Sequence, residues 1–190
     1  MPAVGDPAPD FTLTAHDKSS VTLSEMRGGR VVLAFFPAAF TEVCTKEMCT
    51  FSEGMSDLEC VGASVLGISV DSPFSNSAFA DANDISFPLL SDVHREAVNA
   101  YGVALADFVI PGYTVAQRSV FVVEEDGSIG SAWVADNPGQ EPDYEAVMDY
   151  CAKYYCKYCY ETHSSWDFME PRDDGSELWT CELCGNTSRR

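Results

Sequence analysis

The sequence predicts an α/β domain followed by a smaller module of a different kind. Along the first 150 residues, runs of consecutive apolar residues of strand length alternate with segments of helical length. Continuous apolar strands are typical of a sheet covered on both faces, and strands that alternate with helices indicate the α/β class. The last 40 residues differ, because they hold five of the eight cysteines. We therefore expect one domain over residues 1–150 and a second over residues 151–190.

Four strands are expected in the first domain, each a short apolar run bounded by turn residues. They cover residues 30–36, 63–70, 118–123 and 128–134. Pro37 ends the first strand, and Asp126 with Gly127 forms the turn between the last two. Four helices are expected between and after the strands, over residues 41–59, 76–83, 93–101 and 143–153. Pro142 would open the last of them.

The composition favours a folded, strongly acidic protein. The 190 residues are 46% hydrophobic, which supports a packed core and excludes wholesale disorder. Thirty acidic residues against eleven basic ones give a net charge of −19, and only four of the basic residues are lysines. Such a surface repels phosphate backbones, so no nucleic-acid partner is expected. An acid excess with few lysines is typical of halophilic proteins, although an ordinary acidic protein fits the same numbers.

The sequence carries no signal for a membrane or for secretion. No apolar stretch reaches the length of a membrane span, and the first residues lack the basic and apolar regions of a signal peptide. We therefore expect a cytoplasmic protein with no membrane partner. In that compartment, eight cysteines indicate metal ligands or redox chemistry rather than a disulfide scaffold.

Cys44 ends the motif Pro37-x3-Thr41-x2-Cys44, between the first strand and the first helix. This motif resembles the signature of the peroxiredoxins. Further segments resemble that family in the same order along residues 2–150: DPAPDF, GISVDSPFS, FPLLSD, a strand opened by Arg118, and EPDY. The resemblance is closest to the alkyl hydroperoxide reductase E-like and bacterioferritin-comigratory (PrxQ-like) branches. It implies a thioredoxin-like fold, with a central mixed sheet covered by helices on both faces, and an enzyme that reduces hydrogen peroxide and organic hydroperoxides.

The resemblance assigns catalytic roles to four residues. Cys44 would attack the peroxide as a thiolate, and a position in the first turn of a helix favours that anion. Thr41 lies three residues earlier on the same helical face, where its hydroxyl can bond the sulfur and a peroxide oxygen. Pro37 would shield the pocket from water, and Arg118 would hold the thiolate and stabilise the leaving oxygen. The alternatives are a packing role for Cys44 and a surface ion pair for Arg118.

Cys49 follows Cys44 by five residues, the spacing of the resolving cysteine in PrxQ-like members. In an intact helix, two Cα atoms five residues apart are roughly 8.7 Å from each other, beyond the limit of about 7 Å for a disulfide. The start of the helix would therefore have to unwind. The phrase FFPAAFT resembles the other branch, in which several members lack this cysteine, so a one-cysteine cycle stays open. Cys60 and Cys151 are interpreted as core packing.

Four cysteines of the tail have the spacing of a metal site, Cys156-x2-Cys159 and Cys181-x2-Cys184. Four thiolates can surround a tetrahedral ion. The pattern resembles a zinc ribbon and also the iron site of rubredoxin. Zinc is expected because the first pair lacks the glycine of rubredoxin, while iron, disulfides and a redox-active CxxC stay open. No organic cofactor is expected.

Two other functions fit parts of this pattern. A thiol–disulfide oxidoreductase of the same fold would need a CxxC at residues 44–47, but Thr45, Lys46 and Glu47 follow Cys44. A zinc-ribbon interaction protein on a peroxiredoxin scaffold is expected to lack one of the catalytic residues, and all are present. The resemblance therefore favours a thiol peroxidase that a thioredoxin-like reductant recycles. The oligomeric state, a homodimer included, stays open.

Overall fold

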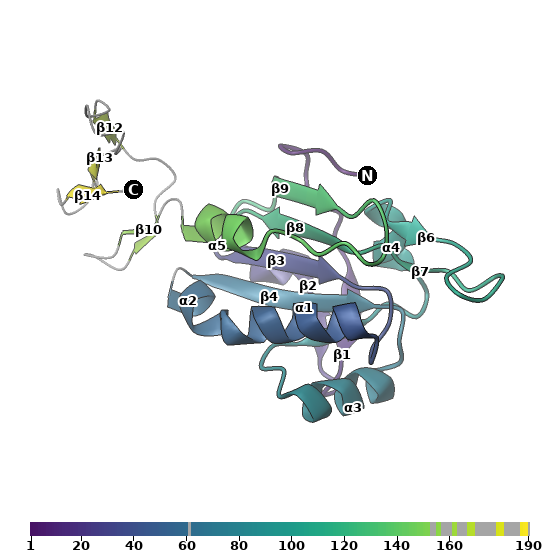
Figure 1. Cartoon of the computed structure of the whole chain (residues 1–190). Helices are drawn as coiled ribbons and strands as arrows, with labels where there is room; N and C mark the ends of the chain where they lie inside the picture. Colours follow the sequence, from purple (N-terminus) through teal and green to yellow (C-terminus); the bar gives the residue numbers. More distant parts are fainter. Residues whose placement is uncertain are drawn as a thin grey trace.

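A seven-stranded sheet with helices on both sides forms most of the molecule (Figure 1). The structure is a computed structural model that describes residues 1–60 and 62–152, together with the backbone of five short strands between residues 155 and 189. In spatial order, the strands of the sheet are β2 (Ser20–Thr22), β1 (Thr12–Ala15), β5 (Leu89–Ser91), β4 (Ala63–Ser69), β3 (Arg30–Phe35), β8 (Ser119–Val123) and β9 (Ile129–Val134).

The sheet is mixed. Its three central strands β3, β4 and β5 are parallel, and the outer strands β1, β2, β8 and β9 pair antiparallel. A separate antiparallel pair consists of β6 (Ala104–Leu105) and β7 (Val115–Ala116). Because β3 and β4 run in the same direction, the segments that leave their carboxyl ends start at one edge of the sheet. The motif that ends at Cys44 is one of these segments.

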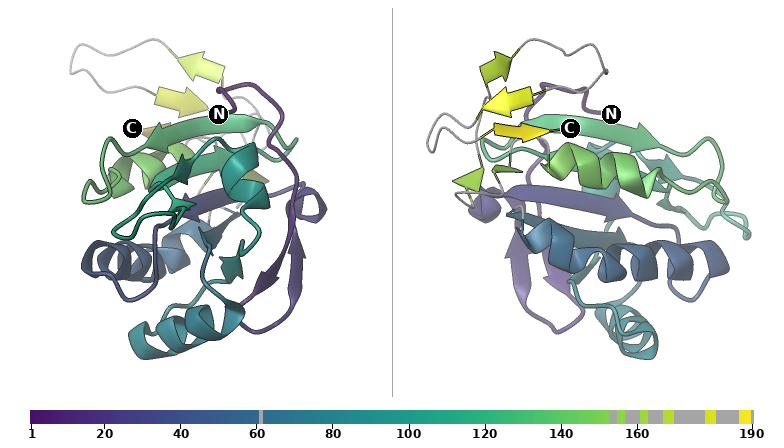
Figure 2. Two further views of the ribbon diagram at one scale, coloured as in Figure 1. Left: turned by 90° about the vertical axis from the view of Figure 1, so that its right-hand side faces the viewer. Right: turned by 60° about the vertical axis from the view of Figure 1, so that its left-hand side comes forward.

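Helices cover both faces of this sheet. In chain order, those of the described part are the 3₁₀ helix η1 (Leu23–Met26), α1 (Glu42–Glu53), α2 (Met55–Cys60), α3 (Pro73–Asn83), α4 (Glu96–Ala100) and α5 (Tyr144–Ala152). Helices α1 and α5 lie on the same face (Figures 1 and 2), where the rings of Phe51 and Tyr144 meet edge to face at 5.4 Å. No helix in the described part of the chain is long and apolar enough to cross a membrane.

Side chains of β3 alternate between two buried clusters. Val31, Leu33 and Phe35 pack in the cluster that includes residues of α4, whereas Val32 and Ala34 pack in the cluster that includes residues of α1, α3 and α5. All residues of β3 are buried. This explains why the strand reads as a continuous apolar run, and it confirms the predicted sheet with both faces covered.

The first predicted helix is wrong as a single element. The segment 41–59 forms two helices, α1 and α2, which meet at Gly54. A Cβ atom at Gly54 would collide with the side chain of Met148 on α5. The absence of a side chain thus lets α5 pack directly against the break.

Two of the other predicted helices start three residues from their expected positions because of local capping, whereas α5 agrees with its prediction to within one residue at each end. Helix α3 begins at Pro73, three residues before the prediction, because the Ser72 hydroxyl accepts a hydrogen bond from Ser75 N at 3.2 Å. Helix α4 begins at Glu96, three residues after the prediction, where Asp92 accepts hydrogen bonds from the backbone N–H groups of Glu96 and Val98 at 2.8 Å each. The expected strands agree with β3, β4, β8 and β9 to within one residue at each end.

Five short strands are described beyond α5. β10 (Tyr155–Cys156) pairs antiparallel with β11 (Glu161–Thr162). β12 (Asp167–Met169), β13 (Leu178–Thr180) and β14 (Thr187–Arg189) form a three-stranded antiparallel sheet. The side chains of the four predicted metal ligands lie outside the described residues, and so does the side chain of Cys60.

Candidate active site

Cys44 is the third residue of α1, which follows β3 after a short connection. The first intrahelical hydrogen bond of this helix runs from Thr45 N to Thr41 O at 2.9 Å. The amides of the first turn, including that of Cys44, therefore have no acceptor within the helix and point toward its amino end. The Cys44 side chain is fully buried. Its sulfur therefore lies at the positive end of the helix dipole.

Arg118 reaches Cys44 from the neighbouring strand. It lies just before β8, and its Nη2 donates a hydrogen bond to Cys44 Sγ at 3.3 Å. The guanidinium is almost completely buried. Its Nε and Nη2 also donate to Pro138 O, at 3.3 and 3.0 Å. The alternative of a surface ion pair is therefore wrong for Arg118.

Glu47 is the ion-pair partner of Arg118. Its Oε2 forms a buried ion pair with Arg118 Nη1, while Oε1 has no hydrogen-bond partner among the described residues. Burial raises the pKa of the Glu47 carboxyl to about 8, against the opposing effect of Arg118. Burial alone would lower the pKa of Arg118, but the charges of Glu47 and Cys44 outweigh it and raise that pKa. The arginine therefore keeps its positive charge beside the sulfur.

Sequence reasoning missed Glu47, although a signal was present. Glu47 lies three residues after Cys44 and so shares its face of α1. That face is buried, and a buried carboxylate requires a cation. The sequence does not identify Arg118 as that cation, because the two residues are 71 positions apart in the chain.

Thr41 and Pro37 lie on the connection between β3 and α1. Thr41 is the N-cap residue of α1, and its hydroxyl donates to Ala38 O at 3.0 Å. The same hydroxyl oxygen can still accept a hydrogen bond. Pro37 is buried just beyond the end of β3.

One pocket of about 230 Å³ brings the predicted residues together. Its wall contains Pro37, Thr41, Cys44 and Arg118, and further atoms of Glu42, Val43, Phe108, Pro138 and Gly139. Four of the five predicted catalytic residues thus share a single cavity. The described wall of this pocket does not include Cys49.

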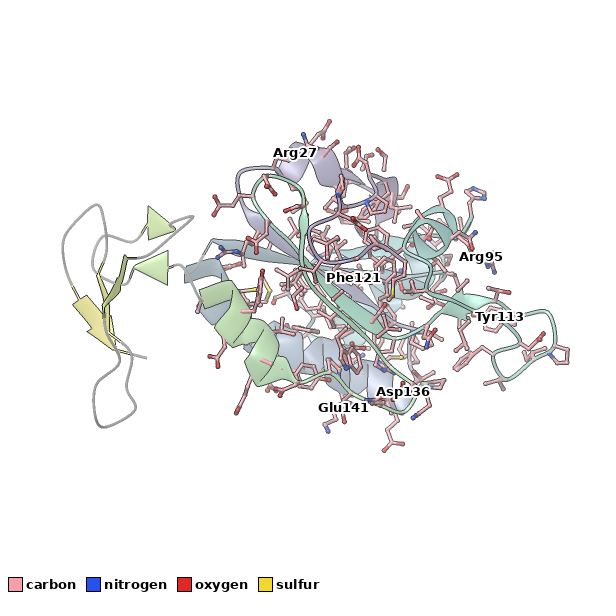
Figure 3. The ribbon with its side chains drawn as sticks, turned by 90° about the horizontal axis from the view of Figure 1, so that it is seen from above. Arg27, Arg95, Tyr113, Phe121, Asp136 and Glu141 are labelled. Carbon is pink, nitrogen blue, oxygen red and sulfur yellow. The ribbon has the colours of Figure 1, made fainter. Side chains whose placement is uncertain are left out.

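The segment between β9 and α5 closes one side of the site. Asp136 and Glu141 mark this segment in Figure 3, which shows it beside α1. Glu141 forms a 2.6 Å ion pair with Lys46 Nζ on α1 and accepts a 3.0 Å hydrogen bond from the Tyr144 hydroxyl on α5. The same segment carries Pro138, whose carbonyl accepts the hydrogen bonds from Arg118.

Two further cysteines are described. Cys49 is half-buried on α1, with Sγ 4.0 Å from Asn83 O. Burial, with the charges of Glu53 and Asp84, raises the pKa of the Cys49 thiol. Cys151 is fully buried in the core, and burial raises its pKa to about 12. This confirms the packing interpretation of Cys151.

The AhpC/TSA family matches residues 4–132, which is more than half of the chain. The chain belongs to the AhpC/TSA family. The matched range includes Cys44, Glu47 and Arg118, and it ends before Pro138. It also ends before the tail, so the four-cysteine metal site stays a prediction.

Relatives within this family include two proteins of Mycobacterium tuberculosis. A thiol peroxidase of strain H37Rv is 34% identical over 149 residues, which cover 78% of this chain and 87% of that protein. A second protein of the same strain, assigned by name to the peroxiredoxins, is 46% identical over 127 residues, which cover 66% of this chain and 80% of that protein.

Solved structures agree with this assignment. The peroxidoxin BcpB from Mycobacterium tuberculosis has a TM-score of 0.73 at 27% identity and covers 82% of this chain and 100% of its own. A mutant of Xylella fastidiosa PrxQ has a TM-score of 0.71 at 25% identity and covers 78% of this chain and 94% of its own. The AhpC/TSA match confirms the family that the sequence motifs indicated, and these structures confirm the expected thioredoxin-like α/β fold.

Proposed function

We propose that this AhpC/TSA family member is a thiol peroxidase with Cys44 as its nucleophile. The observation that carries the proposal is the 3.3 Å contact between Arg118 Nη2 and Cys44 Sγ, at the amino end of α1 and in the wall of a pocket. A cysteine with a buried cation and a helix start beside it has the surroundings of a reactive thiolate rather than of a packing residue. The thiol peroxidase among its relatives supports the same reaction.

In the proposed reaction, the Cys44 thiolate attacks one oxygen of the peroxide. An S–O bond forms as the O–O bond breaks, so the sulfur is oxidised to a sulfenic acid and the peroxide is reduced. The leaving oxygen takes a proton and departs as water or an alcohol. Arg118 lies where it can neutralise the thiolate and then the charge that develops on the oxygens. Thr41 would orient the peroxide through its hydroxyl.

Hydrogen peroxide and organic hydroperoxides are the proposed substrates. The residues of the pocket wall with polar or charged side chains include Thr41, Glu42 and Arg118, while Pro37, Val43 and Phe108 are apolar. A site of this kind can hold the peroxide group against the polar side and an alkyl group against the apolar side.

Cys49 is the proposed resolving cysteine. Its thiol would condense with the Cys44 sulfenic acid, forming a disulfide and releasing water, and the dithiol of a thioredoxin-like reductant would then reduce that disulfide. Both cysteines lie on α1, so the first turns must unwind before the two sulfurs can bond. Unwinding there is favoured by the free amides of the first turn and would expose the disulfide to the reductant.

Peptide mass spectrometry after one equivalent of hydrogen peroxide tests this cycle, with any tail metal kept bound. A crosslink between Cys44 and Cys49 is expected, together with peroxide consumption in a stopped-flow trace. A lasting Cys44 sulfenic acid beside a free Cys49 would instead indicate a one-cysteine enzyme. A link from Cys44 to Cys60, or to a second chain, would assign another resolving residue. The Cys49→Ser variant is the matched control, because it should stop at the sulfenic acid.

The tail is proposed to bind one metal ion, most favourably zinc, through Cys156, Cys159, Cys181 and Cys184. The paired strands support this: the first CxxC begins in β10 and ends before β11, and the second lies in the sequence between β13 and β14. In the sequence, each pair therefore falls at or between two strands that pair antiparallel, and two thiolates so close in the chain can bind one ion.

Elemental analysis of the purified chain, with no metal added, tests the tail site. About one equivalent of zinc is expected, and a chelator should remove it without unfolding residues 1–150. A red, visible-absorbing protein would indicate iron. Four freely titratable tail thiols in a metal-free protein would contradict the site.

A further inference from the structure

A carboxylate just beyond the end of a neighbouring strand bonds the connection that leads into α1. Ala39 N donates a hydrogen bond to Asp71 Oδ2 at 2.8 Å. Ala39 precedes the N-cap residue Thr41 by two positions, and Asp71 lies just beyond the end of β4. The hydrogen bond therefore ties the connection between β3 and α1 to the carboxyl end of the parallel neighbour of β3.

Asp71 is itself held in place by the core. The Ser69 hydroxyl lies 3.0 Å from Asp71 Oδ2, and Asp71 N donates to that hydroxyl at 3.2 Å. Ser69 is fully buried, and its hydroxyl also lies 3.3 Å from the buried side chain of Asn76 on α3. Hydrogen bonds thus connect the backbone of Ala39, through the Asp71 side chain, to β4 and α3.

The backbone of the connection between β3 and α1 is strained at Phe40. Phe40 has a φ of +63°, in the left-handed region that a bulky side chain rarely adopts. Its ring is more than half exposed and rests against Phe79 of α3 at 5.2 Å. Such a conformation persists only where the surroundings enforce it, and here Asp71 holds the preceding residue Ala39 while Phe79 packs against the Phe40 ring.

We propose that Asp71 is a positioning residue of the peroxidase site. By fixing Ala39, it keeps Thr41 and Cys44 in the pocket with Arg118, and it opposes the unwinding of α1 that the Cys44–Cys49 disulfide requires. Asp71 thus sets the balance between the geometry that reacts with peroxide and the open geometry that forms the disulfide. This inference rests on the proposed peroxidase function.

Asp71→Ala and Asp71→Asn test the inference, with Asp81→Ala as the matched control. Asp81 is exposed on α3, and its replacement removes the same charge. In the reduced protein, Asp71→Ala should speed hydrogen exchange of residues 40–48 by about tenfold, the scale of one lost hydrogen bond to a charged group. Exchange in β3 should stay as in the wild type. Asp71→Asn keeps an acceptor oxygen and should recover most of the protection.

The chemical steps give a second readout. Asp71→Ala should slow the oxidation of Cys44 by hydrogen peroxide about tenfold and accelerate the later Cys44–Cys49 bond, so the two rates move in opposite directions. Unchanged exchange in residues 40–48, or exchange that rises equally in β3, would overturn the inference. The exchange measurement needs no peroxide. A wild-type chain that failed to consume peroxide would therefore refute the proposed function while exchange still decided whether Asp71 holds the connection.

Discussion

Replacing Cys44 by serine is expected to lower peroxide turnover by a factor of about 10³ or more, because the reaction then loses its nucleophile. Serine differs from cysteine by one atom and can accept a hydrogen bond from Arg118, so the buried site keeps its shape. Stopped-flow measurement of hydrogen peroxide consumption by the reduced protein gives the rate. Circular dichroism and urea unfolding should show a folded protein with nearly wild-type stability.

Cys49→Ser is the control for this experiment. It should consume one equivalent of peroxide at the wild-type rate and then stall, because the first step needs only Cys44. Cys151 remains in both variants, and its burial keeps it from the peroxide. Near-normal peroxide turnover in Cys44→Ser would show that Cys44 is not the nucleophile. Loss of the reaction with the first equivalent of peroxide in Cys49→Ser would also contradict that role.

Arg118→Ala is expected to cost about 2–4 kcal/mol of transition-state stabilisation, or roughly 30- to 900-fold in the second-order rate with peroxide. The arginine is the cation that contacts Cys44 Sγ, so its loss removes the partner of both the thiolate and the developing oxyanion. The rate constant for Cys44 oxidation measures this effect directly. An unchanged rate would assign Arg118 to a structural ion pair with Glu47.

The Arg118→Ala variant needs a control for its effect on Glu47, the buried ion-pair partner of the arginine. Arg118→Ala leaves a buried carboxyl without its cation, which can destabilise the fold. Burial raises the pKa of Glu47, and Arg118 opposes that effect, so in the variant without the arginine this carboxyl can become neutral by taking up a proton. The double variant Arg118→Ala with Glu47→Gln removes the charge altogether. If its urea stability is normal and its peroxide rate is as low as that of Arg118→Ala, the loss is chemical rather than structural.

Local features of the chain allowed much of the fold to be predicted. The continuous apolar run of β3 and the turn at Gly127 identified strands because these signals act over a few residues. The helix break at Gly54 could not be foreseen from the sequence pattern, and the packing of Met148 from α5 against this glycine is visible only in the folded chain. The start of α4 depends on Asp92 through hydrogen bonds to two backbone amides, a capping arrangement with no unique sequence signature.

The nucleophile and its immediate setting follow from the chain alone, because Pro37, Thr41 and Cys44 lie within eight residues and a strand followed by a helix start is enough to gather them. The surroundings of the sulfur depend instead on how the whole domain packs. Arg118 contacts Cys44, Glu47 and Pro138 through hydrogen bonds and an ion pair. Asp71 accepts a hydrogen bond from Ala39 within the motif. Such contacts form between groups far apart in the chain, and their strength depends on burial and on distances of about 3 Å. Neither quantity exists until the strands have paired and the helices have packed.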